Sequence, residues 1–143
     1  MKNQKIKLFL VDDDAVFLKM LEIELLNHAD FAIETYACGE ECLSNLSHSP
    51  DVIILDYFLD GIVKNAMNGI ETLKKIKSIN PQIPVIMLSS QDKIEVAIDC
   101  MHSGAVDYVV KSETAFVRLQ KIITTIFTIK KMEKELKWYM ERM

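Results

Sequence analysis

Five short apolar runs separated by segments of helical periodicity restrict the fold of this chain more than any other feature. The runs occupy residues 6–11, 31–36, 52–55, 84–88 and 106–110. The second run alternates apolar and polar residues, which favours a strand near a sheet edge, whereas the continuous third and fourth runs favour strands buried on both faces. Strands that alternate with helices predict a doubly wound, five-stranded parallel α/β sheet with helices on both faces and right-handed crossovers.

The intervening segments carry apolar residues three and four apart, the spacing of amphipathic helices. We expect helices over residues 16–26, 39–46, 70–79 and 94–101, and a long one from about 114 to the C-terminus. Asp14 is the expected N-cap of the first helix. Pro81 ends the third helix, and Gly104 ends the fourth.

Length and charge favour one acidic globular domain. The chain has 143 residues and a formal net charge of −4, so sequence-independent nucleic-acid binding is disfavoured. No apolar run approaches the roughly 18 residues of a membrane span, and residues 1–7 do not resemble a signal peptide. Cys38, Cys42 and Cys100 are an odd number without a CxxC pair, which favours reduced thiols in the cytoplasm.

Polar residues of particular types stand where the predicted strands end. Asp12 and Asp13 follow the first strand, Asp56 the third, Ser89 the fourth and Lys111 the fifth. Each alone reads as a helix cap or a solvated charge, but the carboxyl ends of parallel strands meet at one crevice. Carboxylates gathered there require a cation, and Mg²⁺ with oxygen ligands is suitable. With a lysine and a hydroxyl, this predicts a pocket for a phosphoryl group on a carboxylate.

Several stretches carry a resemblance to a known family. They are LFLVDDD (8–14), DVIILDYFLDG (51–61), NGIETLKKIK (68–77), PVIMLSSQD (84–92) and GAVDYVVKS (104–112). The sequence resembles the CheY-like receiver domains of two-component response regulators over about residues 5–128. The resemblance implies a flavodoxin-like sheet with strand order 2-1-3-4-5.

The resemblance also implies roles for residues after the first and third strands. Asp56 matches the phosphoacceptor. Asp12 and Asp13 match the acidic pair that binds Mg²⁺ together with Asp56. The backbone carbonyl of Phe58 falls where the family supplies a further metal contact.

Three more matches lie after the fourth strand and in the fifth. Ser89 matches the hydroxyl that hydrogen-bonds the phosphoryl group, and Lys111 matches the lysine that pairs with it. Tyr108 matches the aromatic switch residue that turns inward on activation.

The chain departs from the family pattern in three places. Residues 60–66 form an insertion after the phosphoacceptor, which is either a solvated loop or a partner contact. Phe58 and Gln91 occupy positions that influence access of water, and a bulky Phe58 predicts a long-lived phosphorylated state. Ser112 replaces a proline that usually follows a cis peptide, so the sequence leaves the isomer after Lys111 open.

The expected domain division is a receiver over residues 1–128 and an extension of the last helix over 129–143. Apolar residues of the last helix follow three- and four-residue steps; they are Leu119, Ile122, Ile126, Ile129, Leu136, Met140 and Met143. Glu133 interrupts this seam, although Met132 lies beside it. The extension carries five basic and three acidic residues. A plain overhang, a seam for a homodimer or another partner, and a membrane-surface or nucleic-acid contact remain alternatives.

The resulting prediction is a cytoplasmic single-domain response regulator. It would receive a phosphoryl group from a histidine kinase or a histidine phosphotransfer protein and would act on a downstream protein. We expect no DNA-binding domain. We also expect no catalysis beyond its own phosphorylation and dephosphorylation. A related aspartyl-phosphate phosphohydrolase would need an Asp-x-Asp pair, which Asp56-Tyr57-Phe58 lacks. A flavin or dinucleotide module would need glycines where the first loop has aspartates.

Overall fold

A computed structural model describes residues 5–59 and 66–143. Its elements are β1 (Lys7–Val11), α1 (Ala15–Leu26), β2 (Ala32–Tyr36), α2 (Gly39–Ser44), a 3₁₀ turn (Leu46–His48), β3 (Val52–Leu55), α3 (Gly69–Ile79), β4 (Val85–Ser89), α4 (Ile94–His102), β5 (Asp107–Val110) and α5 (Ala115–Glu141). The predicted insertion at 60–66 lies almost wholly outside the described residues.

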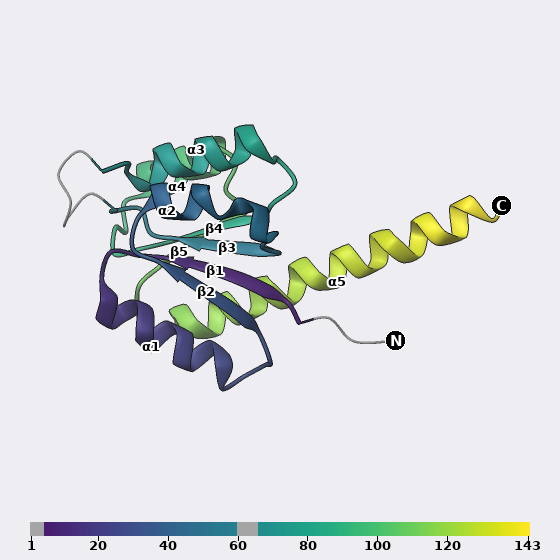
Figure 1. The fold of residues 1–143 in the computed structure, drawn as a ribbon, viewed down its shortest axis with the longest axis horizontal. Helices are drawn as coiled ribbons and strands as arrows, with labels where there is room; N and C mark the ends of the chain where they lie inside the picture. Colours follow the sequence, from purple (N-terminus) through teal and green to yellow (C-terminus); the bar gives the residue numbers. More distant parts are fainter. Residues whose placement is uncertain (1–4, 60–65) are drawn as a thin grey trace.

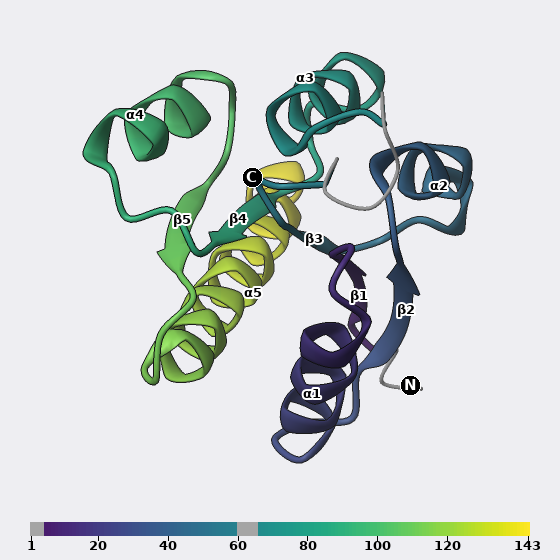
Figure 2. The same ribbon diagram turned by 90° about the vertical axis from the view of Figure 1, so that its left-hand side faces the viewer.

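The five strands form one parallel sheet in the order β2-β1-β3-β4-β5, so the predicted fold class is confirmed. Helices α2, α3 and α4 cover one face of the sheet, and α1 and α5 cover the other (Figures 1 and 2). β2 lies at an edge, as its alternating sequence predicted.

Alternation along the buried strands supplies both cores. Phe9 and Ile53 point into the core beneath α2, α3 and α4, whereas Leu8 and Ile54 point into the core beneath α1 and α5. Every residue of β3 is buried, because the central strand is covered on both faces.

Local signals explain most helix ends. Asp14 caps α1 as predicted, with its side chain accepting hydrogen bonds from the Val16 and Phe17 amides. The predicted helix over 39–46 is too long, because α2 ends at Ser44 and a 3₁₀ turn follows. The residue before Pro50 is disfavoured in the helical region, and Ser49 adopts a positive φ of 58°.

Helix α5 continues well past the sheet. It begins at the carboxyl ends of the strands and extends beyond their amino ends (Figure 1). The Lys130 ammonium donates to the Asp51 carbonyl at 3.3 Å, which ties the helix to the start of β3. In the part of the chain that the structure describes, no helix is long and apolar enough to cross a membrane.

Candidate functional site

Three carboxylates converge where β1 and β3 end. One oxygen from each of Asp12, Asp13 and Asp56 lies within 4.8 Å of the other two. Asp12 and Asp56 are almost fully buried, and Asp13 is partly exposed. The sheet produces this cluster, because Val11 pairs with Leu55 and each strand then delivers its next residue to the same edge.

Lys111 brings a positive charge into this cluster from the end of β5. Its ammonium lies 2.8 Å from Asp12 Oδ2 and 3.5 Å from Asp56 Oδ2. It also lies 4.2 Å from the centre of the Phe17 ring, an arrangement that favours the cation. The peptide bond after Lys111 is trans, since none of the described peptide bonds is cis.

At Asp56, the effects of burial and of Asp12 on the pKa of the carboxyl are opposed by the charge of Lys111. Burial and the neighbouring Asp12 carboxylate raise the pKa of the Asp56 carboxyl, Lys111 acts in the opposite direction, and together they leave this pKa at about 7. At Lys111 burial disfavours the charge, but the hydrogen bond to Asp12 and the charge of Asp56 outweigh it and raise the pKa of the ammonium. Close to neutral pH, Asp56 is therefore poised between its neutral and charged forms.

The donor set fits a hard divalent cation. Three carboxylates offer only oxygen atoms, which Mg²⁺ prefers. An ion between them would offset the repulsion that raises the pKa of Asp56. Receiver domains generally bind Mg²⁺ at such an acidic cluster, so the predicted cofactor agrees with these residues. For Phe58, the amide donates to Asp56 Oδ1 at 3.4 Å, and the use of its carbonyl as a ligand stays a prediction.

The segment after β3 is held tightly against α3. The Gly69 amide donates to the Tyr57 carbonyl at 2.9 Å. A Cβ on Gly69 would lie 2.3 Å from the Asp56 carbonyl oxygen and 2.6 Å from Tyr57 Cα, so only glycine permits this approach. Asn68 and Glu71 form a capping box at the start of α3, which fixes where that helix begins.

Ser89 and Tyr108 both contact the backbone of Gln91. Ser89 is fully buried, and its Oγ accepts a hydrogen bond from the Gln91 amide at 3.1 Å. The Tyr108 ring is buried and its hydroxyl donates to the Gln91 carbonyl at 2.6 Å. The two residues therefore hold the loop between β4 and α4 at the two successive peptide groups that flank the Gln91 Cα.

Sequence reasoning missed two of these contacts. Phe17 was treated only as part of a helical stripe, although its place in the first turn of α1, directly after the Asp14 cap, put it near the strand ends. The Gln91 backbone was missed as the shared partner of Ser89 and Tyr108, because a backbone contact leaves no signal in residue type.

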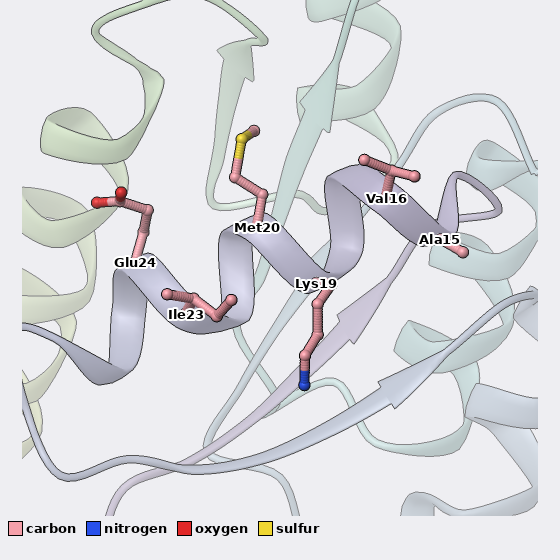
Figure 3. Close-up of a pocket in the computed structure, with 6 residues that line it drawn as sticks. All are labelled: Ala15, Val16, Lys19, Met20, Ile23 and Glu24. Atoms are coloured by element: carbon pink, nitrogen blue, oxygen red, sulfur yellow. The ribbon is translucent and has the colours of Figure 1, made fainter.

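Beside the site, α1 presents an exposed apolar face. Val16 is 80% exposed, Met20 53% and Ile23 49%. With neighbouring side chains they line a shallow surface hollow, whose other members are Ala15, Lys19 and Glu24 (Figure 3). The exposed face starts in the first turn of α1, and this helix follows directly on the loop that carries Asp12 and Asp13.

The fold and the site define a class: a doubly wound α/β domain with an acidic, lysine-containing pocket at the carboxyl ends of its strands. The response regulator receiver domain model matches residues 8–124. The chain therefore belongs to the response regulator receiver family, as the sequence resemblance predicted.

Individual relatives agree with this assignment. A protein-glutamate methylesterase/protein-glutamine glutaminase of Clostridium acetobutylicum is 38% identical over 118 residues, which cover 79% of this chain and 32% of that protein. NtrX from Brucella abortus is similar in fold, with a TM-score of 0.80 at 23% identity over 94% of this chain and 29% of that one. A CheY-like receiver domain protein from Methanospirillum hungatei JF-1 is also similar in fold, with a TM-score of 0.76 at 22% identity. The match covers 90% of this chain and 98% of that one.

The first curated relatives are much longer than this chain. The chain spans between 24% and 32% of their length. What is common to them and to this chain is the receiver domain, a signalling domain of two-component systems and not an enzyme in the usual sense.

Proposed function

We propose that this chain is a single-domain response regulator whose phosphoacceptor is Asp56. The observation that carries the proposal is the convergence of three carboxylates within 4.8 Å, beside the partly buried Lys111, in a receiver domain. Asp12, Asp13, Asp56 and the Phe58 carbonyl would hold Mg²⁺. That ion would offset negative charge on the oxygens of the incoming phosphoryl group.

The transfer is a displacement at phosphorus. An Asp56 carboxylate oxygen forms the new P–O bond while the bond from phosphorus to the nitrogen of a phosphohistidine breaks, and the electron pair of that bond returns to the imidazole. The attacking carboxyl must be ionised. Lys111 favours the ionised form, and its ammonium is placed to pair with a phosphoryl oxygen.

The conformational response is proposed to start at the loop between β4 and α4. Ser89 would exchange its contact with the Gln91 amide for one with a phosphoryl oxygen. Tyr108 holds the carbonyl of the same residue, so movement of the loop and the position of the Tyr108 ring are mechanically linked. A two-state shift of this kind changes the surface formed by α4, β5 and α5.

The proposed partners are a phosphoryl donor and a downstream protein. The donor is a histidine kinase or a histidine phosphotransfer protein, and the exposed apolar face of α1 is suited to it because this helix begins directly after the loop that carries Asp12 and Asp13. Output from the receiver domain is by protein contact. A cytoplasmic location belongs to the proposal, and the three free cysteines agree with a reducing compartment.

Treatment with acetyl phosphate and Mg²⁺ tests the proposal. Intact-mass spectrometry should show one added phosphoryl group on the wild type and none on Asp56→Asn. Asp51→Asn is the matched control and should be modified like the wild type, because Asp51 lies at the opposite end of β3. Modification of Asp56→Asn, or none of the wild type, would contradict the assignment. Catalytic turnover of a small phosphate ester would favour a phosphohydrolase.

A further inference from the structure

The last part of α5 is a helix without a covering surface. Every residue from 131 to 143 is exposed, and the contact of Lys130 with Asp51 is the last described hydrogen bond between this helix and the rest of the domain. Figure 1 shows the helix leaving the sheet and continuing alone. A helix of about a dozen residues is only marginally stable by itself in water, so a partner surface would stabilise it.

The structure changes the register of the predicted seam. Leu119 and Ile126 are buried in the core beneath α5, so they are not available to a partner. Five of the seven exposed apolar residues from 129 on form a separate series with steps of three, four, three and four; they are Ile129, Met132, Leu136, Tyr139 and Met143, between 50% and 100% exposed. Trp138 and Met140 lie outside this series, and Met143 follows the end of α5 at Glu141. Glu133 lies beside this series and does not interrupt it.

This series is a heptad repeat. Residues 129, 136 and 143 are seven apart, as are 132 and 139, which gives the a and d positions of a coiled coil. A stripe of this period is complementary to a second copy of itself, because two like helices supercoil so that their a and d side chains meet along the seam.

The extension as a whole carries more basic than acidic residues, but the residues directly beside the seam favour a second copy over a lipid surface. Glu133 and Glu135 flank the seam on its two sides, and acidic flanks oppose binding to anionic lipid. At about 100° per residue, Lys134 and Trp138 lie opposite Leu136. The Trp138 ring stacks with the Arg142 guanidinium, 3.7 Å from the ring centre, and meets the Tyr139 ring edge to face, with the ring centres 4.9 Å apart.

We propose that residues 129–143 form a parallel, in-register, two-stranded coiled coil between two copies of this chain. In this register each of the five seam residues meets its own counterpart. At the flanking positions Thr128 faces Glu133 of the second copy, and Glu135 faces Met140, so no like charges meet across the seam. The proposal does not depend on the chemistry at Asp56.

Light scattering after size exclusion tests the proposed dimer, on the full chain and without a phosphoryl donor. The wild type should have twice the monomer mass of 16.4 kDa, and Leu136→Glu should return it to the monomer mass with lower helical content. Trp138→Glu is the matched control, because it replaces an exposed apolar residue by the same charge on the opposite side; it should remain dimeric. A monomeric wild type, or equal dissociation of the two variants, would overturn the proposal.

Cysteine crosslinking tests the orientation. Met132→Cys should form a disulfide-linked dimer under mild oxidation, because the two copies of this position meet in the parallel register. Lys134→Cys should not, and the wild type reports the background of the native cysteines. Absence of the Met132→Cys crosslink would refute the parallel register. If the wild type is monomeric and sediments with phosphatidylserine vesicles, the extension binds a membrane surface and the dimer proposal is wrong.

Discussion

The buried charge at Asp56 costs stability, and Asp56→Asn should remove that cost. Asparagine has nearly the shape of the neutral carboxyl, so the variant approximates a protein whose Asp56 stays protonated. The Lys111 ammonium loses one anionic partner but keeps Asp12, at 2.8 Å. The variant should therefore be more stable than the wild type wherever the unfolded Asp56 is ionised.

The size of the effect follows from the shift in pKa from 3.8 to about 7. Each pKa unit corresponds to about 1.36 kcal/mol, so the ceiling at pH 8 is about 4 kcal/mol. Between pH 4 and 7 the folded state keeps a proton that the unfolded state releases, so wild-type stability falls as pH rises through this window. At pH 5 only about 1.5 kcal/mol of the difference should remain.

Urea unfolding in EDTA at pH 5 and pH 8 measures this directly, because EDTA removes any cation that would offset the charge. The slope of free energy against urea should be the same for both proteins, so that the difference in midpoint reports stability. Asp30→Asn is the control, because the Asp30 side chain is 81% exposed and should not change the pH dependence. Equal stability of Asp56→Asn and wild type at pH 8, or a gap that widens toward pH 5, would refute the reasoning.

Three further substitutions test the surroundings of the site. Gly69→Ala should lower the free energy of unfolding by about 1–3 kcal/mol and reduce phosphorylation by acetyl phosphate, because the new Cβ meets the Asp56 carbonyl at 2.3 Å; unchanged stability would contradict this. Tyr108→Phe removes the hydrogen bond to Gln91 and should cost about 0.5–1.5 kcal/mol by urea unfolding while phosphorylation of Asp56 persists. Phe58→Asn should speed loss of the phosphoryl group, followed by mass spectrometry, because Phe58 is predicted to hinder water; wild-type dephosphorylation within seconds would contradict it.

The sheet could be predicted from the sequence because its signals are local. Continuous apolar runs such as 52–55 identify buried strands, and an acidic or basic residue directly after a strand needs no knowledge of packing to be placed at the carboxyl edge. For this reason the sequence predicted one shared site for Asp12, Asp13, Asp56 and Lys111.

The remaining features depend on tertiary contacts that residue type does not encode. The ring of Phe17 meets Lys111 because α1 and α5 pack beside one another on the same face of the sheet. The backbone of Gln91 joins Ser89 to Tyr108 only after the loop is folded. The core takes Leu119 and Ile126 out of the seam predicted on α5, because sequence periodicity does not say which apolar residues become buried.

The length of α5 determines how far a tilt at its first turn moves its far end. Its first turn lies beside Lys111 at the phosphoacceptor end, and its 27 residues span about 40 Å. A tilt of only about 5° at the first turn would carry the far end through roughly 3.5 Å, which is close to the diameter of an atom. Because Leu119, Ile123 and Ile126 are held in the core, such a tilt would also require the packing between α5 and the sheet to shift.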